Sequence, residues 1–177
     1  MNNQAFIDGQ NLHLSTTGAR KSWKVDLERF RVYLREKYKV GKAYYFIGYY
    51  MESQYDLYKH IQEAGFILMF REHHEDMASI KKGNVDTDIV FSVMKSLVER
   101  EKFNRIVLVS GDGDYFRLIQ YLAEKDKLEK ILAPNRKSFS SLYKQFIDNK
   151  FFAFLDDGST KKKIQHKKQG SKKAGSP

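Results

Sequence analysis

Short apolar runs alternate along the chain with segments in which apolar residues recur every three or four positions. The uninterrupted runs predict β-strands, because such runs are typical of strands that a sheet buries on both faces. These runs lie at residues 4–8, 42–50, 66–72, 105–110, 130–134 and 151–155. The helical repeats predict α-helices at residues 25–38, 53–65, 85–101, 115–126 and 138–148.

Strands that alternate with helices in this way indicate βαβ units, which place strands in parallel. We therefore expect an α/β fold with a central, mainly parallel sheet and helices on both of its faces. At 177 residues the chain is long enough to form one domain with a hydrophobic core of its own. We expect this domain to occupy residues 1–158.

Composition excludes several classes of protein. No apolar run approaches the roughly 18 residues that a membrane-spanning helix needs, and the N-terminal residues do not resemble a signal peptide. The absence of cysteine excludes disulfides and thiolate-bound zinc. We therefore expect a cytoplasmic protein with no membrane partner, while the sequence leaves the oligomeric state open, a homodimer included.

Positive charge is concentrated at the C-terminus of the chain, whose formal net charge is +10. Residues 159–177 contain seven lysines, no acidic residue and one isoleucine, so we expect a disordered tail whose removal leaves the fold intact. Such a tail suits a polyanion, because each lysine beside a phosphate releases a counterion. A purely solubilising role explains the same composition equally well.

Aspartates gather where the predicted strands end. Asp8 closes the first strand, Asp112 and Asp114 follow the strand at 105–110, and Asp86 and Asp88 begin the helix that precedes that strand. Ligands of parallel sheets bind at the carboxyl ends of the strands, so these side chains should meet at one edge. Carboxylates without nearby cysteine favour a hard cation, and we expect Mg²⁺ or Mn²⁺.

Each aspartate also has a structural interpretation. Asp8 can stabilise a turn, Asp114 can cap a helix that starts at Tyr115, and Asp86 can improve a helix start through the helix dipole. Asp88 lies nearly opposite Asp86 around a helix, so the two can share a site only where the helix begins. A metal site explains the whole set better than separate structural roles, because all of these aspartates fall at the predicted binding edge.

Three sequence blocks, in this order and spacing, resemble the NYN domain, a branch of the PIN-like nucleases. They are "FIDGQNL" at 6–12, "KKGNVDTDI" at 81–89 and "LVSGDGDYFRLIQYL" at 108–122, and the resemblance extends over residues 4–157. It implies a Rossmann-like PIN fold and metal-dependent cleavage of RNA. It also implies that Asp8, Asp86, Asp112 and Asp114 are the acidic metal-binding residues, with Asn11 in support.

One residue is inserted in this chain relative to the usual "KGVD" block, which leaves the choice between Asp86 and Asp88 open. The expected function is an Mg²⁺- or Mn²⁺-dependent ribonuclease, and the alternative is a non-catalytic RNA-binding or regulatory module of the same fold. In either case we expect Tyr115 to stack on a base. The lysines expected to hold the RNA strand are Lys81, Lys82, Lys161, Lys162, Lys163, Lys167 and Lys168.

Overall fold

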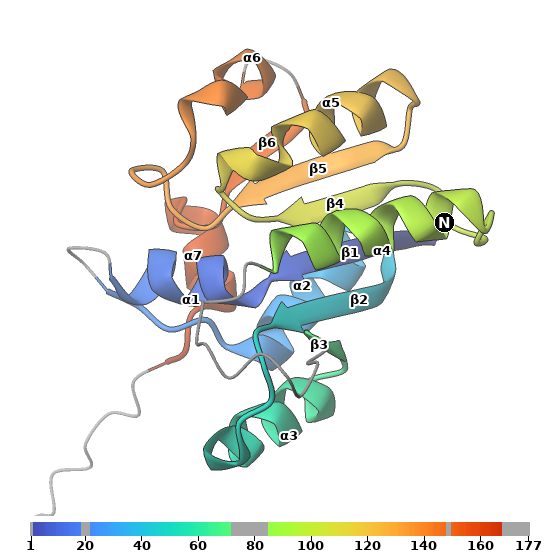
Figure 1. Cartoon of the computed structure of the whole chain (residues 1–177). Coiled ribbons are helices and arrows are strands. Elements are labelled where there is room, and N and C mark those ends of the chain that lie inside the picture. Colours follow the sequence, from blue (N-terminus) through green and yellow to red (C-terminus); the bar gives the residue numbers. More distant parts are fainter. Residues whose placement is uncertain (1, 19–21, 72–84, 148–149, 168–177) are drawn as a thin grey trace, which may run out of the picture.

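A computed structural model describes residues 2–18, 22–71, 85–147 and 150–167. These residues form one six-stranded sheet in the order β3-β2-β1-β4-β5-β6, and every neighbouring pair of strands is parallel (Figure 1). The strands are β1 (Asn3–Asp8), β2 (Val40–Ile47), β3 (Ile67–Phe70), β4 (Ile106–Val109), β5 (Leu128–Ala133) and β6 (Phe152–Phe154). The predicted α/β fold with a parallel sheet is confirmed.

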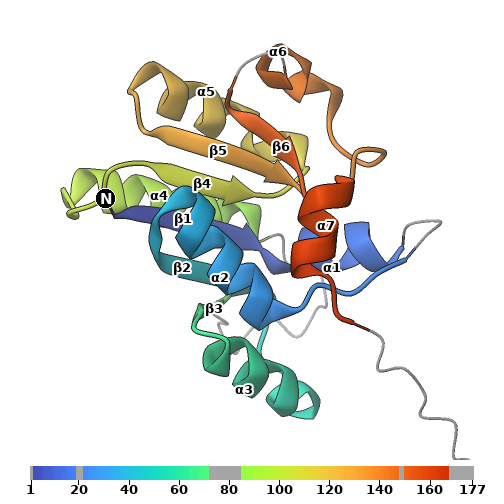
Figure 2. The ribbon, with the colours of Figure 1, turned by 180° about the vertical axis from the view of Figure 1, so that it is seen from behind.

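Helices cover both faces of the sheet (Figures 1 and 2). One face is packed against α1 (Gly9–Thr17), α2 (Leu27–Tyr38), α3 (Tyr55–Glu63) and α7 (Gly158–Ile164). The other face is packed against α4 (Asp86–Val98), α5 (Phe116–Glu124) and α6 (Lys144–Ile147). Short 3-10 turns occur at η1 (Glu52–Gln54), η2 (Gly113–Tyr115) and η3 (Ser141–Tyr143). None of the helices among the described residues has the length and apolar character that crossing a membrane requires.

The two central strands, β1 and β4, contribute side chains to both hydrophobic cores. In β4, Val107 and Val109 enter the core beneath α2, whereas Ile106 and Leu108 enter the core beneath α4. All four side chains are fully buried. A strand covered on both faces gains from apolar residues at every position, which is why the sequence shows uninterrupted runs.

Strand order reverses at the β1–β4 pair. From β1 the chain adds β2 and β3 on one side, and from β4 it adds β5 and β6 on the other. Because Ile7 is in register with Val109, Asp8 at the end of β1 and the loop after β4 leave the same edge of the sheet. This confirms the predicted shared edge and places it at the reversal point, where open parallel sheets bind their ligands.

Helix α1 was not predicted, because its only buried apolar side chain is that of Leu12 and no repeat is visible. The helix expected at 138–148 is also shorter than predicted. It consists of η3 followed by the single turn α6.

The prediction that disorder begins at residue 159 is wrong. Residues 158–164 form α7, in which Thr160 and Ile164 are buried. The backbone after α7 also pairs with the segment before α2, since Asp26 donates its N–H to the carbonyl of Ile164 (2.8 Å) and His166 donates to Lys24 (2.9 Å). Two buried side chains and two backbone hydrogen bonds therefore dock this lysine-rich segment against the domain. Residues 168–177 lie outside the described part of the chain.

Ile164→Ala tests this docking. Ile164 is fully buried in the core beneath α2, so we expect the substitution to lower the free energy of unfolding by about 2–5 kcal/mol in chemical denaturation. Lys163→Ala changes the exposed neighbour and should stay within about 0.5 kcal/mol of the parent protein. Equally small effects of both substitutions would show that α7 is not held against the domain.

Candidate metal centre

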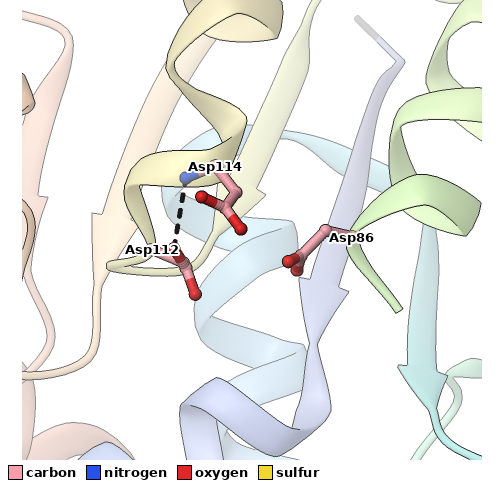
Figure 3. Close-up of side chains that lie close together, drawn as sticks. All are labelled: Asp86, Asp112 and Asp114. Carbon is pink, nitrogen blue, oxygen red and sulfur yellow. Dashed lines mark hydrogen bonds between the residues drawn. The ribbon is translucent and has the colours of Figure 1, made fainter. Parts of the chain in front are cut away.

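Asp86, Asp112 and Asp114 come together at the carboxyl edge of the sheet (Figure 3). Each offers one carboxylate oxygen, and these oxygens all lie within 4.8 Å of one another. Asp86 is buried, Asp112 is half-buried and Asp114 is exposed, so the group runs from the protein interior to solvent. Two segments supply it, namely the start of α4 and the loop between β4 and α5.

The loop after β4 is shaped by Asp112 itself. Its backbone is extended, and its Oδ1 accepts the backbone N–H of Asp114 (3.1 Å), which makes Asp112 the cap of η2. Gly113 lets Ser140 approach this turn closely, because a Cβ at position 113 would lie 2.5 Å from Oγ of Ser140. The capping role considered for Asp114 therefore belongs to Asp112, and the Asp114 carboxylate projects from the turn toward Asp86 (Figure 3).

The structure brings Asp86, and not Asp88, into the group of three. Asp86 is the first residue of α4, and one of its carboxylate oxygens accepts a short hydrogen bond from the Tyr115 hydroxyl (2.5 Å). Asp88 is half-buried, and its Oδ2 has no hydrogen-bond partner among the described residues. The inserted residue in the "KKGNVD" block therefore leaves Asp86 at the cluster.

Asp8 lies behind this group and outside the set of three. It is 3% exposed and caps α1, with Oδ1 accepting the backbone N–H of Asn11 (2.9 Å). Its Oδ2 accepts hydrogen bonds from the hydroxyls of Ser110 (3.4 Å) and Tyr115 (3.2 Å). Burial is the main cause that raises the pKa of Asp8 above its usual range, and the nearby charges of Asp86 and Asp112 raise it further.

Tyr115 is fully buried, so the prediction that it stacks on a base is wrong. Its hydroxyl lies between two carboxylates, at 2.5 Å from Oδ1 of Asp86 and 3.2 Å from Oδ2 of Asp8. Burial, followed by the charge of Asp8, raises the pKa of Tyr115, so its hydroxyl keeps its proton and remains a donor. No local pattern indicates this role, because a tyrosine after "GDGD" is equally compatible with stacking on a base.

Asn11 joins the first sequence block, at 6–12, to the third, at 108–122. Its Oδ1 accepts the backbone N–H of Gly111 (3.0 Å), which joins the first turn of α1 to the loop after β4. The neighbouring Gly9 allows close packing, because a Cβ there would lie 2.6 Å from the backbone oxygen of Phe46 and even closer to the ring of Tyr45. The "DGQN" block thus holds the two loops in a fixed relation.

The predicted RNA-binding lysines fall into three groups. Lys81, Lys82 and Lys168 lie outside the described residues. Lys161 is half-buried, with its Nζ 5.1 Å from the centre of the Trp23 ring, a cation–π contact within the protein. The remaining three, Lys162, Lys163 and Lys167, are exposed on α7 and just after it.

The donor set suits a divalent cation. Three carboxylates this close repel one another, and the half-buried position of the group weakens the screening of that repulsion by water. Oxygen donors without cysteine or histidine are the ligands of hard cations. Asp86, Asp112 and Asp114 could therefore hold a metal ion.

Comparison with known proteins shows which family the chain belongs to. A family model of the NYN domain matches residues 4–155. The chain belongs to the NYN domain family. The NYN domain is a branch of the PIN-like nuclease family, and membership implies a nucleic-acid substrate. The match ends before α7, which this NYN domain carries in addition.

Two further similarities agree with this assignment. The NYN domain is 27% identical over 129 residues to the low amplitude and bright protein LabA of Synechococcus elongatus, covering 68% of this chain and 67% of LabA. A crystal structure of a protein of unknown function from Vibrio parahaemolyticus has the same fold, with a TM-score of 0.71 at 19% sequence identity. That similarity covers 93% of this chain and 96% of the Vibrio chain.

Tyr115→Phe tests whether the shared hydroxyl orients Asp86. Removing the hydroxyl takes away one hydrogen bond that orients the Asp86 carboxylate, and we expect the midpoint for Mn²⁺ or Mg²⁺ stabilisation to rise by about tenfold in concentration. The measurement is the thermal midpoint during metal titration. Tyr38→Phe is the matched control, since it removes a buried hydroxyl that contacts only Tyr33 (3.3 Å) among the described residues. An unchanged metal midpoint in Tyr115→Phe would rule out the positioning role.

Proposed function

We propose that this protein is an Mg²⁺- or Mn²⁺-dependent ribonuclease that hydrolyses phosphodiester bonds at the Asp86–Asp112–Asp114 group. The observation that supports it most directly is the meeting of these three carboxylates at the strand-order reversal of an NYN domain. This reversal point is where an open parallel sheet presents its carboxyl-end loops to a ligand.

A divalent cation bound by these carboxylates supplies Lewis-acid activation of water and neutralisation of charge on the phosphate. The three aspartates have different tasks within that arrangement. Asp86 and Asp112 are fixed by hydrogen bonds to Tyr115 and to the backbone of η2, which suits ligands whose positions must not change. Asp114 is exposed, so it is best placed to orient the attacking water and accept its proton.

The residues behind the carboxylates complete the site. Asp8 adds negative charge and anchors α1. We assign it a supporting role behind the three carboxylates rather than that of a direct metal ligand. Asn11 uses its Oδ1 to hold Gly111, which leaves its amide N–H groups to donate to a phosphate oxygen. Lys81 and Lys82, next to the start of α4 in sequence, would contribute positive charge for the RNA strand.

The alternative function is a non-catalytic RNA-binding or regulatory module. It explains the positive net charge of the chain, but it gives no reason to concentrate three carboxylates where a phosphate would lie. Incubation of labelled single-stranded and structured RNA with Mg²⁺, Mn²⁺ or EDTA separates the two. Binding without cleavage under every condition would favour the module.

Asp112→Asn tests the catalytic role. Asparagine is as good a helix cap as aspartate, so the turn at η2 is retained while one negative charge is removed. We expect metal-dependent cleavage to fall by about a hundredfold or more. The thermal midpoint without metal should hold or rise, because repulsion among the carboxylates is relieved. Cleavage is measured with labelled RNA, and stability by thermal unfolding in EDTA.

Asp56→Asn is the matched control, since it removes an exposed carboxylate from α3. It should leave cleavage unchanged. A purely structural role for Asp112 predicts normal cleavage per folded molecule and an unchanged thermal midpoint, because asparagine keeps the cap. That result would remove Asp112 from the proposed site.

A further inference from the structure

Helices α2 and α7 lie on the face of the sheet opposite α4 and α5 (Figure 2). Side chains from both helices line a surface hollow. Cationic side chains outnumber carboxylates around it, with only Glu28 and Glu36 on the acidic side. The cationic residues of this hollow are Arg29, Lys37, Lys162, Lys163 and Lys167. A second hollow adjoins it and includes Thr17, Lys24, His166 and again Lys167. Since Lys167 lines both, we call them together the α2–α7 groove.

The cationic side chains of this groove differ in whether they already have a polar partner within the protein. Arg29 lies 3.7 Å from Asp26, and Lys37 contacts the hydroxyl of Tyr33 (3.3 Å), so both already have partners. The three lysines of the C-terminal segment, Lys162, Lys163 and Lys167, are exposed and make no ion pair with a described residue. Their charge is therefore directed to solvent, or to an anion that occupies the groove.

Helix α1 connects the groove to the candidate metal centre. It begins directly after Asp8, and its last residue, Thr17, lines the groove. Nine helical residues at 1.5 Å each span about 13 Å. Successive nucleotides of a stacked strand rise by about 3.4 Å along the strand axis, so this distance corresponds to about four stacked nucleotides.

We propose that the α2–α7 groove binds the phosphate backbone of the RNA at about four nucleotides or more from the bond that is cleaved. The proposal rests on the proposed ribonuclease function, and it adds a second contact surface built by a helix beyond the matched NYN domain. An extended polyanion fits better than a small anion, because the unpaired lysines are spread along an open surface. The groove thereby makes affinity depend on the length of the RNA.

The double variant Lys162→Glu/Lys163→Glu tests this dependence on the full chain. Two fluorescent RNAs are compared, one of about four nucleotides and one of about twelve, with the same sequence at the cleavage site. We expect KM for the long RNA to rise by about tenfold with kcat unchanged, and KM for the short RNA to stay within about twofold. Binding of the long RNA in EDTA, measured by fluorescence anisotropy, should weaken and show a shallower dependence on salt.

The matched control is Lys102→Glu/Lys125→Glu. It makes the same change in charge at the amino-terminal edge of the sheet, opposite the edge that carries the candidate metal centre. Lys162→Gln/Lys163→Gln is a milder second variant that removes the positive charges without adding negative ones. Each variant is compared with the parent protein only if its thermal midpoint is unchanged. Equal losses for short and long RNA, unchanged affinity for the long RNA, or an equal loss in the control would each overturn the proposal. If the parent protein cleaves neither RNA, the ribonuclease function fails, while binding of the long RNA in EDTA still decides the role of the groove.

Discussion

Strands β1 and β4 lie side by side and run parallel, and their pairing brings together loops that are about a hundred residues apart in sequence. Asp8 leaves the end of one strand and Asp112 follows the other, on the same edge of the sheet. Asn11 then joins the two loops through the backbone N–H of Gly111. Without this pairing the carboxylates would be separate turn and capping residues, because each one alone has an ordinary structural explanation.

Like charges at this edge oppose folding, and neutral hydrogen-bond donors among the described residues limit that cost. Asp8 accepts hydrogen bonds from a backbone N–H and two hydroxyls, and Asp112 accepts one from its own turn. The buried hydroxyl of Tyr115 is shared between Asp8 and Asp86. These neutral donors fix the carboxylates without cancelling their charge, so the attraction for a cation is preserved.

Helix α7 shows how tertiary packing separates residues that look alike in sequence. Three consecutive lysines occupy it, yet Lys161 lies over the ring of Trp23 whereas Lys162 and Lys163 face solvent. Ile164 enters the core and determines which side of the helix is turned inward. The docked helix thus converts a basic segment into one wall of a groove, on a face that α1 links to the candidate metal centre.

The sequence by itself determined the parallel α/β architecture and the shared edge of Asp8 and Asp112, because buried strands need continuous apolar runs and parallel strands end together. It did not determine helices α1 and α7, whose few buried side chains produce no periodic pattern. Only the tertiary structure decided that Asp86 rather than Asp88 joins the cluster, and that Tyr115 holds carboxylates instead of a base. Those outcomes depend on contacts between distant segments, which local sequence patterns do not encode.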